Sequence, residues 1–346
     1  MWLKQKIKGF VKLLESVLYD LYYSIHPRET LMKQGHKLDV DVSPLLEIDA
    51  NYGEWLIHPC VRYIHSGFNG YKWWMVFTPY PNFNSRYENP MLYYGDGNED
   101  VPPKKWKFVG VVQGVHEKGY NADCNLFYYK EKLWITWKEA GTCNTCEEYG
   151  YKATMFCTFD GYIFSKPKVL CNNIDETNMY LASQTLMNIN GCINILAVFT
   201  PNSYLPVSNS KKGPRNLAIF ELCDKDNNVV KFDFKGIARQ SYPRGFDFWH
   251  IDTFEYSGKY YCLATPEKAD QILIGESLDG IHYKFCPIPL LHKYGKEKTD
   301  YTYKVSGVVV SDIFYLFYPM RSKNKSVVSL YVTSIKFSQL LSLIHK

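Results

Sequence analysis

The stretch HPCVRYIHSGFNGYKWWMVFT, residues 58–78, decides the fold, because its pattern returns four more times along the chain. An apolar strand leads to a turn with Asn, Asp or Gly, and a second strand with large aromatic side chains follows. The other copies are ADCNLFYYKEKLWITWK from Ala122, LASQTLMNINGCINILAVFT from Leu181, WHIDTFEYSGKYYCLAT from Trp249 and YKVSGVVVSDIFYLFYP from Tyr303. Short strands separated by such turns are typical of an all-β protein built from repeats.

The spacing of the copies predicts one closed ring. They begin roughly 54 to 68 residues apart, which is room for four strands of ordinary length and their loops, or one propeller blade. We therefore predict a five-bladed β-propeller over residues 36–335. Residues 36–48 are expected to add a strand to the last blade, so that no sheet edge stays open. A two-sheet sandwich is the competing fold, but it gives no reason for five repeats.

The two ends of the chain have a helical pattern instead. In residues 1–30, apolar side chains from Trp2 to Ile25 recur three or four residues apart, lysines fall on another face, and Pro27 closes the segment. We expect an amphipathic helix that either docks on a protein surface or lies in the plane of a membrane surface. Residues 336–346 are expected to form a short helical tail.

The composition narrows the classes of function. The net charge of +5 is modest for 346 residues and much of it comes from lysines near the N-terminus, so nucleic acid is not an expected partner. Neither a secretory signal nor an uninterrupted apolar span is evident, so we expect a cytoplasmic protein. If the protein binds a membrane, we expect the N-terminal helix to make the contact at the inner face. Most of the ten cysteines lie in apolar runs and the pair Cys143/Cys146 has no second pair, so no metal ligands or cofactors are predicted.

Several of these motifs resemble a known group of proteins. The first repeat, the YENP sequence at residues 87–90, WHID at 249–252 and the Asp-Gly hairpins are similar to five-bladed proteins related to glycoside hydrolase families 43, 32 and 130. Members of this group often accompany bacterial surface-polysaccharide genes. The resemblance covers about residues 50–335. It implies a central funnel lined by the first strand of each blade, in which three acidic residues hydrolyse a glycosidic bond. Some relatives hold a cation there.

The catalytic pattern of these families is only partly present. Asp123 matches the aspartate of the second blade, whereas His58 stands before Pro59 where the first blade usually carries an aspartate. On the third blade, Ser183 and Gln184 stand where a glutamate is usual. The incomplete acid set puts ordinary glycoside hydrolysis in doubt.

Other polar residues complete the predicted site, in which His58, Asp123 and His250 share one phase of the repeat. We expect Asp123, Glu88 and Asp252 to form the catalytic acidic set. The predicted substrate-binding residues are His58, His250, Trp249, Arg86, Asn89, Arg239, Arg244, Tyr303 and Ser306. Structural alternatives are an ion pair between Glu88 and Arg86 and a buried pair of His250 and Asp252, which lie on one face of their strand.

Three functions stay open at this point, and all of them have carbohydrate as the partner. The leading expectation is a glycoside-hydrolase-like enzyme that acts on a polysaccharide or glycan precursor. The second is a glycosyltransferase or phosphorylase in surface-glycan synthesis, in which Arg239 and Arg244 would bind donor phosphate. The third is a non-catalytic glycan-binding or assembly module that keeps the funnel without the acids.

Overall fold

The structure is a computed structural model and describes most of the chain outside the N-terminal segment and several loops. The described residues are 30–47, 55–97, 99–114, 119–141, 151–172, 179–201, 215–222, 232–241, 248–266, 271–292, 303–321 and 327–345. The amphipathic helix predicted for residues 1–30 therefore lies outside the described residues, apart from its last position. Arg244 lies outside them as well.

The described strands form five four-stranded units in chain order, here called blades 1 to 5. Blade 1 contains β3 (Leu56–Phe68), β4 (Tyr71–Pro79), β5 (Met91–Gly95) and β6 (Lys105–Val111). Blade 2 contains β7 (Gly119–Tyr129), β8 (Lys132–Gly141), β9 (Tyr151–Phe159) and β10 (Lys168–Asn172). Blade 3 contains β11 (Met179–Ile189), β12 (Cys192–Pro201), β13 (Asn216–Leu222) and β14 (Phe232–Ser241).

The last two blades add a connection and a closure. Blade 4 contains β15 (Phe248–Tyr256), β16 (Lys259–Pro266), β17 (Gln271–Ser277) and β18 (His282–Phe285), with β19 (Leu291–His292) beside β17. Its β18 pairs in parallel with β14 of blade 3. Blade 5 contains β20 (Ser306–Val310), β21 (Ile313–Arg321), β22 (Val328–Lys336) and β1 (His36–Lys37).

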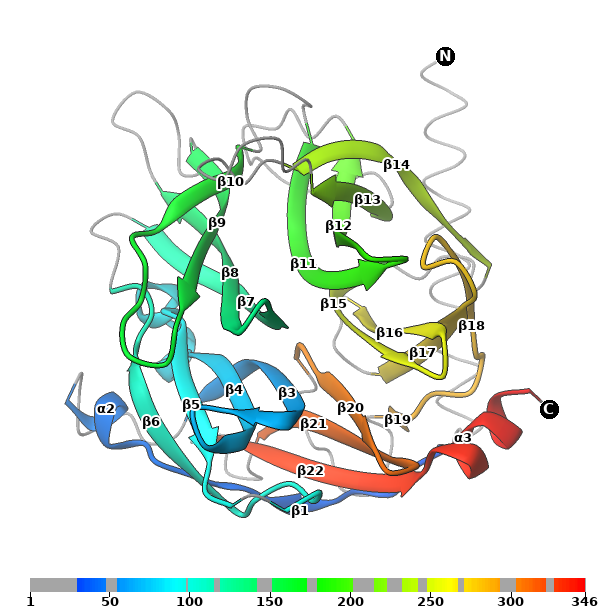
Figure 1. The fold of residues 1–346 in the computed structure, drawn as a ribbon, viewed down its shortest axis with the longest axis horizontal. Coiled ribbons are helices and arrows are strands. Elements are labelled where there is room, and N and C mark those ends of the chain that lie inside the picture. Colours follow the sequence, from blue (N-terminus) through cyan, green and yellow to red (C-terminus); the bar gives the residue numbers. More distant parts are fainter. Residues whose placement is uncertain are drawn as a thin grey trace.

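The blades stand around a common axis, with the first strand of each blade innermost (Figure 1). Each innermost strand contacts the innermost strand of the next blade, and β20 of blade 5 contacts β3 of blade 1. The prediction of an all-β propeller is confirmed. The pairing of β1 with β22 also confirms that residues 36–48 supply a strand to the last blade. The adjoining β2 (Asp39–Val40) pairs with β6 of blade 1, so this segment joins the first and last blades.

Large aromatic side chains fill the spaces between blades. Side chains alternate between the two faces of a strand, so Trp73 and Trp74 of β4 face opposite neighbours. The Trp73 ring lies 6.2 Å from that of Phe317 in blade 5, and the Trp74 ring lies 6.1 Å from that of Phe159 in blade 2. Both tryptophans are almost completely buried. The aromatic second strand of blade 1 therefore packs against both neighbouring blades.

Helices are minor elements of the described chain. The short α2 (Ser43–Leu46) follows β2, and the 3-10 turns η1 (Pro81–Phe83) and η2 (Ser85–Tyr87) lie between β4 and β5. At the C-terminus, α3 (Phe337–Ile344) buries Phe337 and Leu340 against blades 4 and 5. None of the described helices has the length and apolar character needed to cross a membrane.

Candidate functional site

The innermost strands of four blades share an irregularity at the same phase of the repeat. The pairing register shifts between Ile57 and Cys60, Ala122 and Asn125, Leu181 and Ser183, and Phe248 and His250. A β-bulge of this kind bends the strand and changes the direction of a side chain. Within two of the bulges, His58 and Asp123 both have φ of 54°, which is uncommon for residues other than glycine and often found at functional sites.

The bulges bring His58, Asp123 and His250 together from three blades. Asp123 Oδ1 lies 2.7 Å from His250 Nδ1 and 3.5 Å from His58 Nε2. One nitrogen or oxygen atom of each residue lies within 4.8 Å of the others. All three side chains are buried. We call this group the central cluster.

The facing atoms of the central cluster lack hydrogen-bond partners. Among the described residues, His58 Nε2, Asp123 Oδ1 and both ring nitrogens of His250 make no hydrogen bond, although they are fully buried. His250 Nδ1 lies 2.7 Å from Asp123 Oδ1, so these two atoms are strongly coupled, and the Asp123 carboxylate opposes the burial-driven fall in the pKa of the imidazole. Buried polar atoms without partners are costly and rare in native proteins, and they suggest that another group binds between them.

The second strands of the blades hold the cluster in this orientation. His58 Nδ1 is 2.8 Å from Thr78 Oγ1 of β4, which leaves Nε2 toward the cluster. Lys138 Nζ of β8 donates to Asp123 Oδ2 at 2.6 Å, which leaves Oδ1 toward the cluster. Metal-binding histidines and carboxylates commonly have their outer atoms fixed in this way, so that the inner atoms keep one direction.

Burial and charge set the protonation of the cluster. Burial lowers the pKa of His58 well below its usual value and that of His250 to about 4, although the Asp123 carboxylate opposes the shift. Burial alone would raise the pKa of Asp123, but Lys138 and the two histidines outweigh it and lower that pKa well below its usual range. At neutral pH the cluster therefore presents two neutral imidazoles and one carboxylate.

This donor set fits a divalent transition metal. Metal ligands must be deprotonated, and two imidazoles with one carboxylate form a common catalytic set that leaves a coordination position open. The orphaned atoms of the central cluster match this requirement. The sequence analysis did not assign these residues as metal ligands, because they lie far apart in the chain and match no local metal-binding motif. Their common phase in the repeat was the available signal.

Glu88 lies beside the cluster in a loop after η2. Its backbone oxygen accepts a hydrogen bond from Asn121 N at 2.8 Å, which ties the loop to β7. Burial raises the pKa of the Glu88 carboxyl to about 8, the negative charge of Asp123 adds to the rise, and Lys138 opposes it. Arg86 is exposed, and the described ion pairs do not join it to Glu88. A carboxyl group with a pKa near neutral is suited to proton transfer.

The raised pKa of Glu88 predicts a measurable loss of stability with pH. The folded protein keeps a proton that the unfolded chain releases, so stability should fall as the pH rises from 4.5 to about 8. The Glu88→Gln variant should match the wild type near the lower pH and become increasingly more stable than it toward the higher one. Thermal unfolding of both proteins in chelator across this range measures the difference. A difference that does not change with pH would show that Glu88 is not held protonated.

Half-buried aromatic rings border the cluster. The Tyr303 ring centroid lies 5.0 Å from that of His58 and 4.9 Å from that of His250. The Trp249 ring centroid lies 5.7 Å from that of His250, and the guanidinium of Arg215 lies 4.5 Å from the Trp249 ring. Apolar walls with a few polar groups are typical of small-molecule sites, and such rings suit the C–H faces of a sugar.

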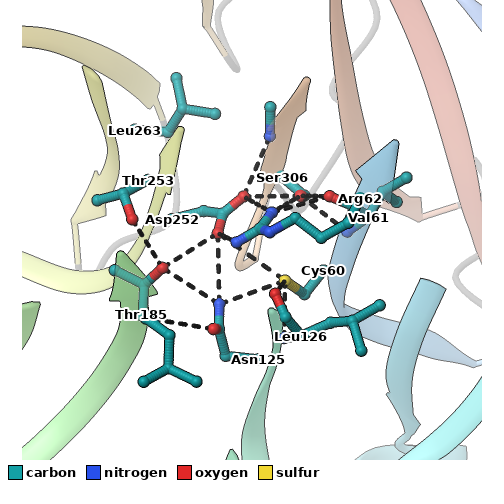
Figure 2. Close-up of polar contacts among 12 residues, drawn as sticks. Cys60, Val61, Arg62, Asn125, Leu126, Thr185, Asp252, Thr253, Leu263 and Ser306 are labelled. Atoms are coloured by element: carbon teal, nitrogen blue, oxygen red, sulfur yellow. Dashed lines mark hydrogen bonds and ion pairs between the residues drawn. The ribbon is translucent and has the colours of Figure 1, made fainter. Parts of the chain in front are cut away.

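Asp252 belongs to a separate hydrogen-bond network, which lies one layer along the axis from the cluster. Figure 2 shows the polar contacts of this network. Arg62 donates to Asp252 Oδ1 at 2.7 Å, and Ser306 Oγ donates to Oδ2 at 2.7 Å. Asn125 Nδ2 and Thr185 Oγ1 each lie 3.4 Å from Oδ1. Both carboxylate oxygens are thus engaged, which favours a structural role for Asp252 and Ser306 over the predicted roles in catalysis and substrate binding.

This lower network follows from strand periodicity. Residues two positions apart on a strand point to the same face, so the positions two residues after His58, Asp123 and His250 form the next layer along the axis. The layer receives one residue from each blade, namely Cys60, Asn125, Thr185, Asp252 and Ser306. The axis under the cluster is therefore filled by a hydrogen-bonded layer.

The remaining predicted residues in the described chain are one buried asparagine and two exposed arginines. Asn89 is buried and its Oδ1 accepts from Asn121 Nδ2 at 3.0 Å, so it supports the loop of Glu88. Arg86 is exposed, and Arg239 is exposed on the outer strand β14.

The sequence analysis missed Thr78, Lys138 and the fully buried Lys304, whose Nζ donates to the backbone oxygen of Cys124 at 2.7 Å.

Comparisons with known proteins identify the fold. No family model and no curated protein sequence matches the chain. The crystal structure of an N-acetylgalactosamine deacetylase from F. plautii, in complex with blood group B trisaccharide, matches 90% of this chain and 97% of that chain, with 14% identity and a TM-score of 0.69. CoXyl43, a GH43 β-xylosidase/α-arabinofuranosidase from a compost metagenome in complex with xylotriose, matches 88% and 94%, with 12% identity and a TM-score of 0.59.

A third similar structure is the GH43_1 enzyme from Xanthomonas citri complexed with xylose, which covers 82% of this chain and 88% of that chain. Its identity is 10% and its TM-score is 0.58. The chain therefore has the propeller fold of GH43 enzymes. Likeness at such low identity shows the fold alone, and the site has to be interpreted from its own residues.

Proposed function

We propose that this protein is a metal-dependent hydrolase that removes an acyl group, in the first place an N-acetyl group, from a carbohydrate bound over the central cluster. One observation carries the proposal. His58, Asp123 and His250 direct buried atoms without hydrogen-bond partners toward one another, in the protonation states that bind a divalent metal. The deacetylase among the similar structures supports the choice of an acyl group.

The proposed chemistry is an ordinary amide hydrolysis. A divalent ion supplies polarisation of the acyl carbonyl and a more acidic water molecule. The water oxygen bonds to the acyl carbon, the carbon–nitrogen bond breaks, and a carboxylate and an amine leave. Glu88 is the proposed proton carrier: the charge of a bound divalent ion would favour its carboxylate form, which takes a proton from water and returns it to the leaving amine. Tyr303 and Trp249 would pack against the sugar rings beside the cluster.

The arrangement of acids supports this reaction over glycosidic cleavage. Most glycoside hydrolases cleave the glycosidic bond with two carboxyl groups on opposite sides of it. Among the described residues at the axis, Asp252 is bound to Arg62 and Ser306, and Asp123 is bound to Lys138. That leaves Glu88 as the acid available for proton transfer in the described part of the site, which is enough for a metal-assisted hydrolysis.

Product analysis tests the proposal. Purified protein, treated with chelator and then supplied with zinc, manganese or cobalt, is incubated with oligosaccharides that carry N-acetylgalactosamine or N-acetylglucosamine. We expect metal-dependent release of acetate and a free amine on an intact oligosaccharide, detected by mass spectrometry. Acetate release that is independent of added metal would contradict the metal site. Shortened oligosaccharides that keep their acetyl groups would show a glycosidase instead.

A further inference from the structure

Lys304 is a buried positive charge beside the central cluster. It lies just before β20, the first strand of blade 5, and its side chain is completely buried. The nearby ion pairs join Asp123 to Lys138 and Asp252 to Arg62. Among the described residues, no ion pair includes Lys304. A buried charge is normally paired or held at a metal site, so this lysine requires an explanation beyond the filling of space.

The Lys304 side chain reaches across the axis of the propeller. Its Nζ donates to the backbone oxygen of Cys124 at 2.7 Å, and Cys124 belongs to blade 2, which is not a neighbour of blade 5 in the ring. Along β7, Cys124 lies between Asp123 of the central cluster and Asn125 of the next layer. The ammonium group of Lys304 therefore lies near the axis, between the cluster and that layer.

The charge of Lys304 acts on both layers. Burial is the main cause of the lowered pKa values of His58 and His250, and Lys304 lowers both of them further. In the next layer, burial raises the pKa of the Cys60 thiol to about 11, and Arg62 and Lys304 oppose the rise. Both effects agree with the position that the hydrogen bond to blade 2 gives the ammonium group.

Lys304 gives the site a net positive charge. Asp123 is the carboxylate of the cluster, and Lys138 Nζ neutralises it at 2.6 Å. Burial raises the pKa of Glu88 to about 8, so at neutral pH this carboxyl is mostly protonated before a metal binds. The charge of Lys304 is therefore not balanced by the described acidic groups of the site, and a bound divalent ion would add to it.

We propose that Lys304 acts on the metal site as a fixed positive charge, which weakens binding of the divalent ion and strengthens binding of an anionic oxygen group beside it. This inference rests on the proposed function. Like charges repel and opposite charges attract, and both interactions are stronger in a buried site than in water. In amide hydrolysis, negative charge develops on the acyl oxygen in the transition state and remains on the carboxylate product. Lys304 thus favours the transition state and bound acetate at the expense of metal affinity.

Metal and anion titrations of the full-length protein test the proposal. Protein treated with chelator is titrated with zinc by calorimetry. Sodium acetate is then titrated into the cobalt-loaded protein and followed by visible absorption. The variants are Lys304→Met, which removes the charge, and Lys304→Gln, which removes the charge and keeps an N–H donor for Cys124. The matched control is Lys132→Met, which removes a lysine charge from the exposed turn between β7 and β8.

We expect both Lys304 variants to bind zinc about tenfold more tightly than the wild type and acetate about tenfold more weakly, because one buried charge is removed. The control should match the wild type in both titrations. Changes of opposite sign distinguish an electrostatic role from a structural one, since loss of a residue that only supports the cluster weakens both kinds of binding. Circular dichroism confirms folding, and Lys304→Gln gives the same comparison if Lys304→Met does not fold.

The outcomes separate this inference from the proposed function. A wild type that binds no zinc would contradict the metal site, and with it both proposals. If the wild type binds zinc and the Lys304 variants have unchanged affinities, the metal site stands and the inference about Lys304 is wrong. Weaker binding of both zinc and acetate would assign Lys304 a structural role instead. A Lys304→Gln variant that behaves as the wild type would show that the hydrogen bond to Cys124 matters rather than the charge.

Discussion

Replacing His250 with phenylalanine should abolish metal binding and lower kcat/KM for deacetylation by about 10³-fold or more, because metal assistance is worth several kcal/mol of transition-state stabilisation. The ring of His250 packs 4.9 Å from those of His58 and Tyr303. Phenylalanine keeps that packing and removes the two nitrogens, which make no hydrogen bond among the described residues. The variant should therefore fold, and its loss of function should come from the missing ligand.

Calorimetric titration with zinc and metal analysis after dialysis measure the first effect, and acetate release measures the second. His65→Phe is the matched control, because His65 lies on β3 but is exposed and away from the cluster. We expect the control to bind one metal ion per chain with unchanged affinity. If the His250→Phe variant keeps wild-type metal affinity, His250 is not a ligand and the proposed site is wrong.

Replacing Asp252 alone with leucine should lower the free energy of unfolding by about 3 kcal/mol, because it leaves the Arg62 guanidinium buried without its counter-charge. The estimate is at the low end for such pairs, since the Arg62 side chain keeps 14% of its surface exposed. The loss also removes the acceptor of Ser306 and Gly307 at the axis. Chemical denaturation of the variant and the wild type gives the difference.

A double variant separates the ion pair from the packing. Replacing Arg62 with methionine in the Asp252→Leu background removes both charges, so we expect it to recover most of the lost stability. Asp96→Asn is the control, because its ion pair with Lys107 is about half exposed on both sides and should contribute less than about 1 kcal/mol. A double variant that is less stable than Asp252→Leu would show that the layer needs its polar contacts more than its charge balance.

The repeat was sufficient to predict the fold from the sequence, but it predicted the site only in part. His58, Asp123 and His250 were singled out because they share one phase of the repeat, and the structure brings all three together. Asp252 follows His250 by two residues. Strand alternation therefore places it on the same face of the strand but one layer further along the axis, where it pairs with Arg62. Arg62 was not a candidate, because a single basic residue within an apolar strand gives no local signal of its partner in blade 4.

By itself, the sequence determined an all-β propeller, its closure by residues 36–48, and the common repeat phase of His58, Asp123 and His250. These properties depend on periodicity within each strand and on the regular spacing of the blades, which are local features of the chain. Only the tertiary structure decided how those residues are grouped. The bulges at His58 and Asp123 set side-chain directions that no spacing rule contains, and supports such as Thr78 and Lys138 come from neighbouring strands. Metal binding depends on those directions to within a fraction of an ångström, and so the function can be argued only from the assembled ring.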